Sequence, residues 1–369
     1  MKSRAPRHDP AIDHVNVSVY TIPTDSPESD GTLEWNATTL VLAGASAANC
    51  TGIGYTYADR STATLIKELL AKVVEGRDAM ATSANWQLMV RAIRNLGRQG
   101  IASMAIAAVD NALWDLKARI LGLPLVTLLG AAREGVAVYG SGGFTSYDDA
   151  RLSRQLSGWI EQGIPRVKMK VGREPERDAD RVGVARRAIG SMAELFVDAN
   201  GAYTRKQALE LSECFREQQV SWFEEPVSSD DLEGLHLMRD RAPAGMQIAA
   251  GEYGYDLPYF QRLLSAGAVD VLQADATRCA GITGFLQVAA LCDARSMQLS
   301  AHCGPSVHAH PCCAANAVCH VEYFHDHVRI EHMLFDGALT PHKGVLTPDR
   351  SRPGMGLDLK HSDAEQFRV

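Results

Sequence analysis

The stretch Val167-Lys168-Met169-Lys170-Val171 decides the fold, because the pattern that it begins recurs along the chain. Each recurrence is a short apolar run that ends in a polar residue, which is typical of a buried strand. The later runs are Phe196–Asn200, Trp222–Pro226, Ile248–Glu252, Val271–Asp275 and Leu299–His302. Their terminal polar groups lie 23 to 28 positions apart, which is the length of a strand, a loop and a crossover helix.

Polar groups at the ends of successive parallel strands indicate a (β/α) barrel, which keeps its chemistry on that rim. We predict one more strand at 136–139 and helices at 148–162, 178–189, 204–218, 230–239, 258–266 and 283–294. Thr204 and Gln207 form a capping box for one helix, and Pro258 suits the first turn of another. The barrel domain is therefore expected to span residues 130–345.

The region 1–129 has a different pattern, with strands before helices. The predicted strands are 12–22, 38–42 and 52–57, and the predicted helices are 61–74, 85–96 and 101–121. Residues 24–34 are rich in Ser, Asp and Pro, which favours a mobile loop. The last helix is expected to stop at Gly122 and Pro124. This order of elements predicts an α+β domain, and we expect the tail 346–369 to pack back on it.

The composition is that of an ordinary globular protein of 369 residues, with 46% hydrophobic and 22% charged residues. A formal net charge of −7 gives no electrostatic reason to expect nucleic acid or an anionic membrane as partner. No apolar run of about 18 residues is present, and Met1 to Pro10 lacks the apolar core of a signal peptide. The eight cysteines form no disulfide pattern in so long a chain, so a cytoplasmic enzyme is expected.

Two lysines lie on the strand that opens the pattern. Residues i and i+2 of a strand point to the same side, so Lys168 and Lys170 face one way. Inside a barrel that direction is inward, where a lysine must find an anion or lose its proton. The alternative is that both side chains reach the rim and stay solvated.

Three carboxylates, Asp198, Glu224 and Glu252, end three consecutive runs. Converging on one rim, they would repel one another unless a cation lay between them. Oxygen ligands without cysteine or histidine indicate a hard ion, with Mg²⁺ as the first choice. The alternative is a purely structural cluster of salt bridges. Asn200 faces the same side as Asp198 and is placed to orient a ligand or a water.

Asp275 and His302 end neighbouring runs. A carboxylate bonded to one imidazole nitrogen fixes the tautomer and raises the basicity of the other nitrogen. This pair predicts a general base that lies opposite Lys170 across the barrel. The alternative is a structural histidine packed against the core.

Taken together, these residues resemble the mandelate racemase subgroup of the enolase superfamily. The motifs that carry the resemblance are Lys168-x-Lys170, Asp198-Ala199-Asn200, Glu224-Glu225-Pro226, Gly251-Glu252, Asp275 and His302. Earlier in the chain, the segment from Ala107 to Leu116, Gly122–Leu125 and Leu128–Gly130 look like the capping-domain signature of that superfamily. The resemblance covers residues 12–360. It implies an α+β capping domain over an α/β modified TIM barrel, (β/α)₇β.

The resemblance also implies a role for each site residue. Asp198, Glu224 and Glu252 would bind Mg²⁺, with the substrate carboxylate completing the shell of the ion. Lys168 and Glu322 would help to hold the charge of an enediolate. Lys170 would address one face of the α-carbon, and the Asp275–His302 pair the other.

One departure concerns the sixth strand, where the related muconate-lactonising enzymes carry a catalytic lysine. The nearest basic residue here is Arg278, which is too basic to act as a base. We therefore prefer the mandelate racemase subgroup and expect Arg278 to bind substrate. The residues around Glu322 carry too little pattern to fix its role independently.

Two bases on opposite faces allow racemisation, or dehydration with His302 protonating a departing β-hydroxyl. Among relatives with this residue set dehydration is the commoner activity, so the resemblance favours a lyase, an acid-sugar dehydratase that yields a 2-keto-3-deoxy acid. A racemase, epimerase or cycloisomerase is the alternative. Substrate choice is expected to lie in residues 24–35 and 54–57, with Tyr55 and Tyr57 as binding residues. The expected partner is a small sugar acid, and the resemblance suggests a homo-oligomer, a dimer or an octamer.

Two other classes remain open. The stretch 302–327 is dense in cysteine and histidine, which would suit a structural zinc module or metal store. It contains no C-x₂-C pair, and Cys312 and Cys313 are adjacent, so a buried helix with small residues explains it better. A relative that binds acid sugars without catalysis is the other class, against which the complete set of catalytic residues argues.

Overall fold

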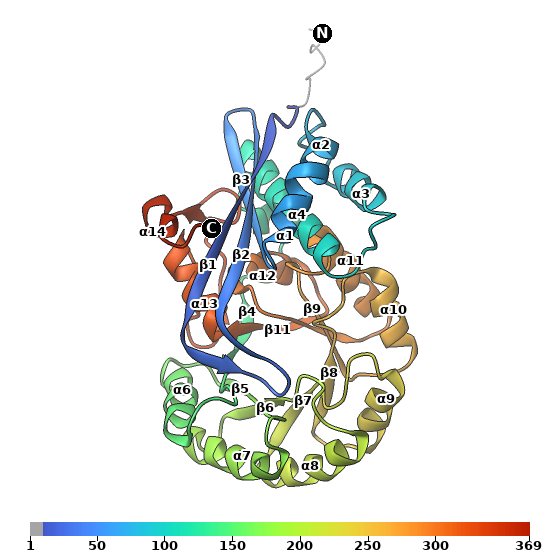
Figure 1. Ribbon diagram of the computed structural model, residues 1–369, viewed down its shortest axis with the longest axis vertical. Coiled ribbons are helices and arrows are strands. Elements are labelled where there is room, and N and C mark those ends of the chain that lie inside the picture. Colours follow the sequence, from blue (N-terminus) through green and yellow to red (C-terminus); the bar gives the residue numbers. More distant parts are fainter. Residues whose placement is uncertain (1–9) are drawn as a thin grey trace.

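The computed structural model describes residues 10–369 and contains a closed barrel with a smaller domain above it (Figure 1). Residues 1–9, most of the segment for which we predict no signal peptide, lie outside the described residues. Among the helices that are described, none combines the length and the apolar character that a membrane crossing needs.

The smaller domain, which we call the capping domain, begins with an antiparallel sheet in the order β1-β2-β3. Its strands are β1 (His14–Ser29), β2 (Glu34–Ala47) and β3 (Cys50–Tyr57). The helices that follow are α1 (Ser61–Leu65), a π-helical turn η1 (Ile66–Leu70), α2 (Ala71–Val74), α3 (Thr82–Ala92), α4 (Ile101–Leu121) and α5 (Leu125–Leu129). The predicted α+β capping domain is confirmed.

Small residues bring α4 and β3 into close contact. Ala108 and Ala112 of α4 are fully buried, and a Cβ placed on Gly54 of β3 would lie 2.3 Å from the backbone nitrogen of Ala112. Only glycine fits at that distance. The helix ends at Gly122, whose φ of 66° is a left-handed cap that glycine adopts without steric cost.

The prediction of a mobile loop at residues 24–34 was wrong in its extent. Strand β1 continues to Ser29, with a register shift against β2 between Pro23 and Glu28. Only a tight turn remains, in which Asp30 Oδ1 accepts the N–H of Leu33 at 2.7 Å. Ser29 is buried and its hydroxyl bonds that of Thr145 on the barrel at 2.6 Å. The polar residues that suggested a loop are therefore bonded within the fold.

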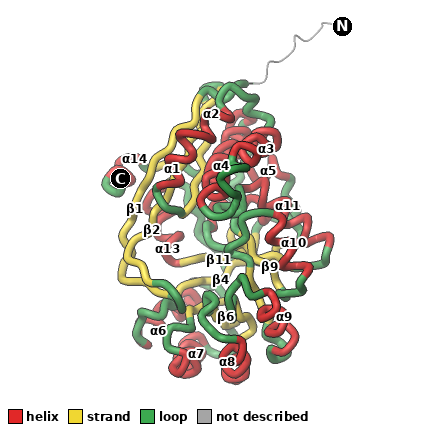
Figure 2. The backbone as a smooth tube through the Cα atoms, turned by 45° about the vertical axis from the view of Figure 1, so that its right-hand side comes forward, coloured by secondary structure: helices red, strands yellow, loops and turns green. Residues whose placement is uncertain are grey.

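Eight parallel strands form the barrel, which closes because β11 pairs with β4. They are β4 (Val136–Gly142), β5 (Arg166–Lys170), β6 (Glu194–Asp198), β7 (Val220–Glu224), β8 (Gln247–Ala250), β9 (Val271–Ala274), β10 (Gln298–Ala301) and β11 (Val318–Phe324). Between them lie α6 (Asp149–Glu161), α7 (Pro175–Ile189), α8 (Arg205–Glu217), α9 (Leu232–Arg241), α10 (Leu257–Ser265), α11 (Gly281–Ala294) and α12 (Pro305–Ala314). The predicted (β/α)₇β barrel is confirmed, and Figure 2 shows its helices outside the strands.

Aromatic side chains fill the barrel below its rim. Tyr139, Phe196 and Trp222 form a buried cluster with Ala249 and Val271. The rings of Phe196 and Trp222 are stacked, with centroids 5.2 Å apart. This apolar floor closes the barrel from beneath, so the polar groups at the strand ends lie on its upper side.

The last part of the chain returns to the capping domain. It consists of α13 (His325–Leu334), β12 (Phe335–Asp336), β13 (Val345–Leu346), β14 (Asp358–Leu359) and α14 (His361–Glu365). The carbonyl of Phe367 accepts the N–H of Thr21 on β1 at 2.8 Å. Arg119 of α4 forms an ion pair with Asp358 at 3.1 Å. The tail therefore contacts both the sheet and the long helix of the capping domain.

Candidate active site

Three carboxylates meet at the ends of neighbouring barrel strands. Asp198 ends β6, Glu224 ends β7 and Glu252 follows β8 by two residues. Phe196 and Trp222 lie two positions before the first two carboxylates and fill the barrel, so Asp198 and Glu224 also point inward. All three carboxylates are buried, and one oxygen of each lies within 4.8 Å of the others.

Lys168 and Lys170 of β5 balance part of this negative charge. Lys170 Nζ donates to Asp198 Oδ2 at 2.5 Å, and Lys168 Nζ donates to Glu224 Oε1 at 2.5 Å. Burial disfavours each ammonium, but the carboxylates outweigh it: Glu224 and Glu322 hold the pKa of Lys168 well above its usual value, and Asp198 raises the pKa of Lys170. Both lysines thus face inward and pair with anions.

The carboxylate cluster suits a hard divalent cation. Its ligand atoms are all oxygens, which Mg²⁺ prefers, and Glu252 Oε2 is buried without a hydrogen-bond partner. Burial, followed by the charge of Asp198, raises the pKa of Glu224 well above its usual value. The two lysines therefore do not neutralise the cluster, and a divalent cation would supply the missing positive charge.

His302, directly after β10, and Asp275, directly after β9, form the predicted pair. His302 Nδ1 donates to Asp275 Oδ2 at 2.9 Å, and the other ring nitrogen, Nε2, lies 3.3 Å from Glu252 Oε2 on the cavity wall. Burial would raise the pKa of Asp275, but the hydrogen bond from His302 and the charges of His308 and Arg278 hold it well below its usual value. Asp275 is therefore ionised and able to stabilise an imidazolium on His302.

Glu322 comes from β11 and divides its two oxygens between two sets of groups. Oε1 lies 2.9 Å from Lys168 Nζ and accepts the hydroxyl of Ser141 at 2.5 Å. Oε2 accepts the backbone N–H of Cys303 at 3.1 Å. The charges of Lys168 and His302 overcome the effect of burial and hold the pKa of Glu322 well below its usual value. Glu322 is therefore an anion in this structure.

A cavity of about 430 Å³ lies between the capping domain and the barrel rim. From the barrel, its wall includes Lys170, Asn200, Glu252, Tyr253, Arg278, His302, Cys303, Glu322, Phe324 and His327. From the capping domain, it includes Asp30, Leu33, Trp35, Ala37, Thr38, Thr39, Tyr57, Ala58 and Asp59. A larger surface hollow of about 720 Å³, near Tyr147 and Arg177, contains none of these charged groups. The smaller cavity is therefore the candidate active site.

The residues expected to bind substrate differ in how they reach this cavity. Asn200, Tyr57 and Arg278 line it, and Arg278 Nη1 donates to the carbonyl of Glu252 at 3.2 Å. Lys168 is fully buried beneath it, among the carboxylates.

Tyr55 does not line this cavity. Its side chain is fully buried, and its hydroxyl donates to Glu331 of α13 at 2.6 Å. Its ring stacks on Phe335, with centroids 5.2 Å apart. Tyr55 therefore contributes to the contact between β3 and the later elements α13 and β12, and it does not line the cavity.

Sequence reasoning gave no individual role to Glu225, His327 or Cys303, which lie at or beside the site. Glu225 is buried, and burial followed by the charge of Glu252 raises its pKa well above its usual value; its place beside Glu224 at a strand end was the available clue. His327 stacks on Tyr57, with ring centroids 3.4 Å apart. Cys303 Sγ lies 3.2 Å from His302 Nε2. The contact between His327 and Tyr57 joins elements far apart in sequence, α13 and β3.

Comparison with known proteins assigns each of the two domains to a family. Residues 34–130 match the mandelate racemase / muconate lactonizing enzyme N-terminal domain, and residues 151–364 match the enolase C-terminal domain-like family. The chain is 32% identical to the 3,6-anhydro-alpha-L-galactonate cycloisomerase of Streptomyces coelicolor, over 95% of this chain and 98% of that protein. It is 31% identical to the L-talarate/galactarate dehydratase of Salmonella typhimurium, over 84% of this chain and 77% of that protein.

Solved structures agree with these matches. A mandelate racemase/muconate lactonizing enzyme-like protein from Rubrobacter xylanophilus is 56% identical, with a TM-score of 0.96 over 98% of this chain and 100% of the other. A racemase from Streptomyces coelicolor with bound magnesium is 30% identical, with a TM-score of 0.91 over 97% and 100%.

The homologues are acid-sugar dehydratases and cycloisomerases, so the predicted enzyme class is confirmed at this level, with lyases and isomerases both represented. The superfamily is magnesium-dependent. The chain belongs to the mandelate racemase / muconate lactonizing enzyme family of the enolase superfamily.

Proposed function

We propose that the protein is a Mg²⁺-dependent acid-sugar dehydratase that converts a sugar acid to a 2-keto-3-deoxy acid. The observation that carries this proposal is that Lys170 and His302 line one cavity beside the cluster of three carboxylates. One group can take the α-proton while the other protonates the leaving hydroxyl.

Asp198, Glu224 and Glu252 would hold the metal ion, as the all-oxygen donor set suggests, together with a buried oxygen of Glu252 that makes no hydrogen bond. When bound, Mg²⁺ would act as a Lewis acid on the substrate carboxylate and stabilise the second negative charge of the enediolate. When Asp198 binds the metal ion, Lys170 loses the ion pair that raises its pKa. The neighbouring ammonium of Lys168 lowers the pKa of Lys170 as well. Lys170 is then able to act as a base.

Lys170 Nζ would take the proton from the carbon next to the carboxylate. His302, protonated at Nε2 and held through Nδ1 by Asp275, would give its proton to the β-hydroxyl, which leaves as water. The resulting enol then takes its keto form. The proton gained by Lys170 equals the proton lost by His302, so the two groups return to their starting states by exchange with solvent.

Lys168 and Glu322 would support the charge that develops on the substrate carboxylate. Lys168 stays cationic among three carboxylates, at 2.5 Å, 2.9 Å and 3.4 Å. A substrate carboxylate beside Glu322 would favour the protonated form of that side chain by like-charge repulsion. Glu322 would then donate a hydrogen bond to the enediolate, which is stronger in the transition state than in the substrate.

The cavity wall suits a hydroxylated substrate. Tyr57, Asn200 and Arg278 are the side chains that we propose for substrate binding, and Thr38 and Asp59 add polar groups from the capping domain. The buried oxygen Oδ1 of Asn200 has no hydrogen-bond partner in this structure, so it is available to a substrate hydroxyl.

A cycloisomerase is the second candidate, because the 32% identical relative from Streptomyces coelicolor carries that name. It would use the same enediolate chemistry with a ring oxygen as the leaving or attacking group. Racemisation would need only Lys170 and His302 on opposite faces of the α-carbon.

A library of mono- and diacid sugars with Mg²⁺ tests the proposal. Formation of a 2-keto acid, measured as semicarbazone absorbance, is expected for at least one acid. A library that yields no keto acid but shows α-deuterium exchange in D₂O would replace the dehydratase by a racemase or epimerase. Conversion of a lactone without free acid as substrate would favour the cycloisomerase.

We also propose a cytoplasmic homo-oligomer. All eight cysteines are free thiols in the structure, which suits a reducing compartment. Light scattering of the purified protein tests the assembly, and a monomer at micromolar concentration would contradict it.

A further inference from the structure

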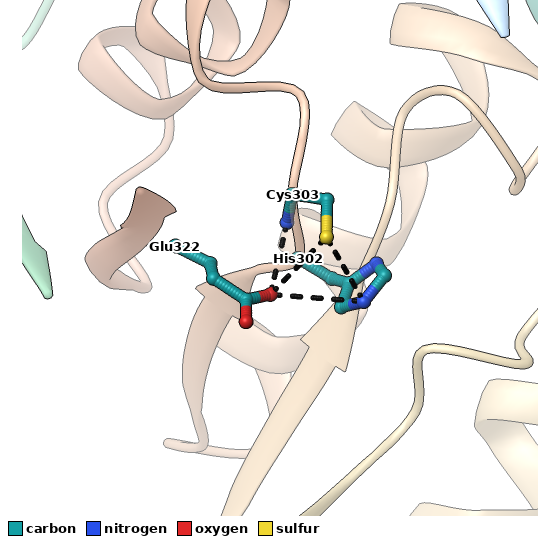
Figure 3. A group of neighbouring side chains, drawn as sticks. All are labelled: His302, Cys303 and Glu322. Atoms are coloured by element: carbon teal, nitrogen blue, oxygen red, sulfur yellow. Dashed lines mark hydrogen bonds and ion pairs between the residues drawn. The ribbon is translucent and has the colours of Figure 1, made fainter. Parts of the chain in front are cut away.

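Beside the carboxylate cluster lies a second group of potential metal ligands, which comes from the β10 end and from β11. His302 Nε2, Cys303 Sγ and one oxygen of Glu322 lie within 4.8 Å of one another. All three residues are buried, and the dashed lines in Figure 3 join a Glu322 oxygen, the Cys303 sulfur and a His302 ring nitrogen pairwise. The proposed dehydration uses His302 and Glu322 but gives Cys303 no role.

From this group we infer a second metal site, for a soft divalent cation such as Zn²⁺, whose occupation blocks the proton-transfer atom of His302. The inference of the site rests on its own geometry. Only its inhibitory effect rests on the proposed function.

The distances match a tetrahedral ion. Metal–ligand bonds of about 2.3 Å to sulfur and about 2.0–2.1 Å to nitrogen and oxygen give ligand separations of roughly 3.6 Å from sulfur and roughly 3.4 Å between nitrogen and oxygen. In the structure, Cys303 Sγ lies 3.2 Å from His302 Nε2 and 3.5 Å from Glu322 Oε2. His302 Nε2 lies 3.6 Å from Glu322 Oε2. Only small side-chain movements are needed to bind an ion.

The remaining atoms of these side chains are already fixed, as in established metal sites. His302 Nδ1 bonds the Asp275 carboxylate, an arrangement that orients a ligating imidazole and strengthens Nε2 as a ligand. Glu322 Oε1 is held by Lys168 and Ser141, so Oε2 is the oxygen that faces the group. Each residue therefore turns one donor atom toward the others, and a bound ion would replace the contacts that Sγ makes with Nε2 and Oε2. His302 Nε2 also lies 3.3 Å from Glu252 Oε2.

The backbone holds Cys303 in place. Its φ of 52° lies in the left-handed region, which is costly for a residue with a side chain and is found where surrounding contacts impose it. Its N–H donates to Glu322 Oε2 at 3.1 Å, and its side chain lines the cavity. An ion can therefore reach the thiol from the cavity, and the thiol proton passes to solvent when sulfur coordinates.

The two sites would select different ions. The cluster of Asp198, Glu224 and Glu252 offers oxygens alone, which suits Mg²⁺. The mixed nitrogen, sulfur and oxygen set prefers Zn²⁺ or Co²⁺ over Mg²⁺, because thiolate is a soft ligand. Since the second site contains Nε2 of His302, Zn²⁺ there removes the general acid without displacing Mg²⁺.

Cobalt is a direct probe of this site, and its readout needs no turnover. Co²⁺ added to the protein in excess Mg²⁺ should give a thiolate-to-cobalt charge-transfer band in the near ultraviolet. The band should disappear in Cys303→Ser and persist in Cys319→Ser, a matched control on β11 whose thiol bonds the carbonyl of Leu299 instead. His302→Asn should weaken Co²⁺ binding by about tenfold or more, since even outer-shell partners of a ligand contribute roughly 10–100-fold. This variant also serves if the serine variant does not fold.

Absence of the cobalt band in the wild-type protein, or its persistence in Cys303→Ser, would overturn the site.

A second experiment measures the inhibition of keto acid formation by Zn²⁺. The rate of each variant is compared with its own rate without zinc. The inhibition constant should rise about tenfold or more in Cys303→Ser and stay unchanged in Cys319→Ser. Equal inhibition of both variants would overturn the inhibitory effect. A cobalt band in a protein without dehydratase activity would uphold the site and reject the proposed function alone.

Discussion

Replacing Asp275 by asparagine tests whether the catalytic role proposed for His302 depends on the carboxylate of Asp275. Asp275 Oδ2 accepts the Nδ1–H of His302 at 2.9 Å, and Oδ1 accepts the backbone N–H of Thr277 at 2.6 Å. The amide keeps the shape of the carboxylate. It removes the negative charge beside the imidazole, and its NH₂ group can favour the wrong tautomer.

The size of the effect follows from the distance. Unit charges 2.9 Å apart attract by roughly 5–6 kcal/mol at an effective dielectric constant of about 20. Arg278, whose Nε lies 3.8 Å from Asp275 Oδ2, already offsets part of this attraction. In a Ser-His-Asp triad the same substitution lowers kcat by about 10⁴. We therefore expect kcat for keto acid formation to fall by about 10³ to 10⁴, or roughly 4–5.5 kcal/mol.

Steady-state assays with the best acid from the library measure this effect. Asp293→Asn, at an exposed position near the end of α11, is the matched control and should keep the wild-type rate. Titration calorimetry should show unchanged Mg²⁺ binding in Asp275→Asn, because Asp275 lies outside the carboxylate cluster. A folded Asp275→Asn protein with intact Mg²⁺ binding and kcat within about tenfold of wild type would refute the role of the pair.

Three further predictions concern the metal, the buried charges and pH. Glu252→Gln should weaken Mg²⁺ binding by about tenfold or more, and an unchanged calorimetric affinity would remove Glu252 from the ligand set. Lys168→Met leaves buried carboxylates unpaired, so the metal-free protein should lose roughly 3–5 kcal/mol of unfolding free energy in urea; a loss below about 1 kcal/mol would contradict this. Burial raises the pKa of Asp110 to about 7, despite hydrogen bonds from Thr283. Because the folded pKa exceeds the unfolded one, the native state binds the proton more tightly, and this stability is lost as pH rises from about 4 through 7. In Asp110→Asn the amide oxygen can still accept the N–H of Thr283, and the amide NH₂ can donate to the Thr283 hydroxyl oxygen. The variant should therefore remove that decline and gain up to roughly 4 kcal/mol at pH 8; parallel stability–pH curves for the two proteins would be the contrary result.

The barrel and its rim were predictable because local pattern and function coincide there. Each strand from β5 to β10 is a short apolar run that ends at the rim, and inward residues alternate with outward ones. Asp198 and Glu224 follow Phe196 and Trp222 at a spacing of two, so the residues that fill the barrel also aim the carboxylates. For this part of the chain, strand periodicity alone fixed the direction of the side chains.

Strand β11 was not predicted from the sequence because the residues that it turns toward the barrel interior are polar. His320 and Glu322 occupy positions i and i+2, so no apolar run marks the strand. In the structure His320 bonds Ser300 at 2.8 Å and packs against Tyr139, which satisfies it in the interior. Such partners come from distant strands and leave no local signal.

The wall contributed by the capping domain was predicted less well. Tyr55 and Tyr57 share one face of β3, so periodicity could not separate them. The position of β3 over the barrel decides the difference: Tyr57 reaches the cavity, while Tyr55 meets Glu331 of α13. Residues 24–34 were misjudged for a similar reason, because bonds such as that between Ser29 and Thr145 depend on domain contact.

The proposed dehydration requires two proton-transfer groups, for which we propose Lys170 and His302 at opposite faces of one α-carbon. The decisive measurement is ¹H NMR of a substrate acid in D₂O with Mg²⁺, comparing His302→Asn with Lys170→Met. We predict that His302→Asn loses keto acid formation by about 10² to 10⁴ but still exchanges the α-proton, whereas Lys170→Met loses both. Equal loss of exchange in both variants, with Mg²⁺ binding intact, or exchange surviving in Lys170→Met, would contradict this division of roles.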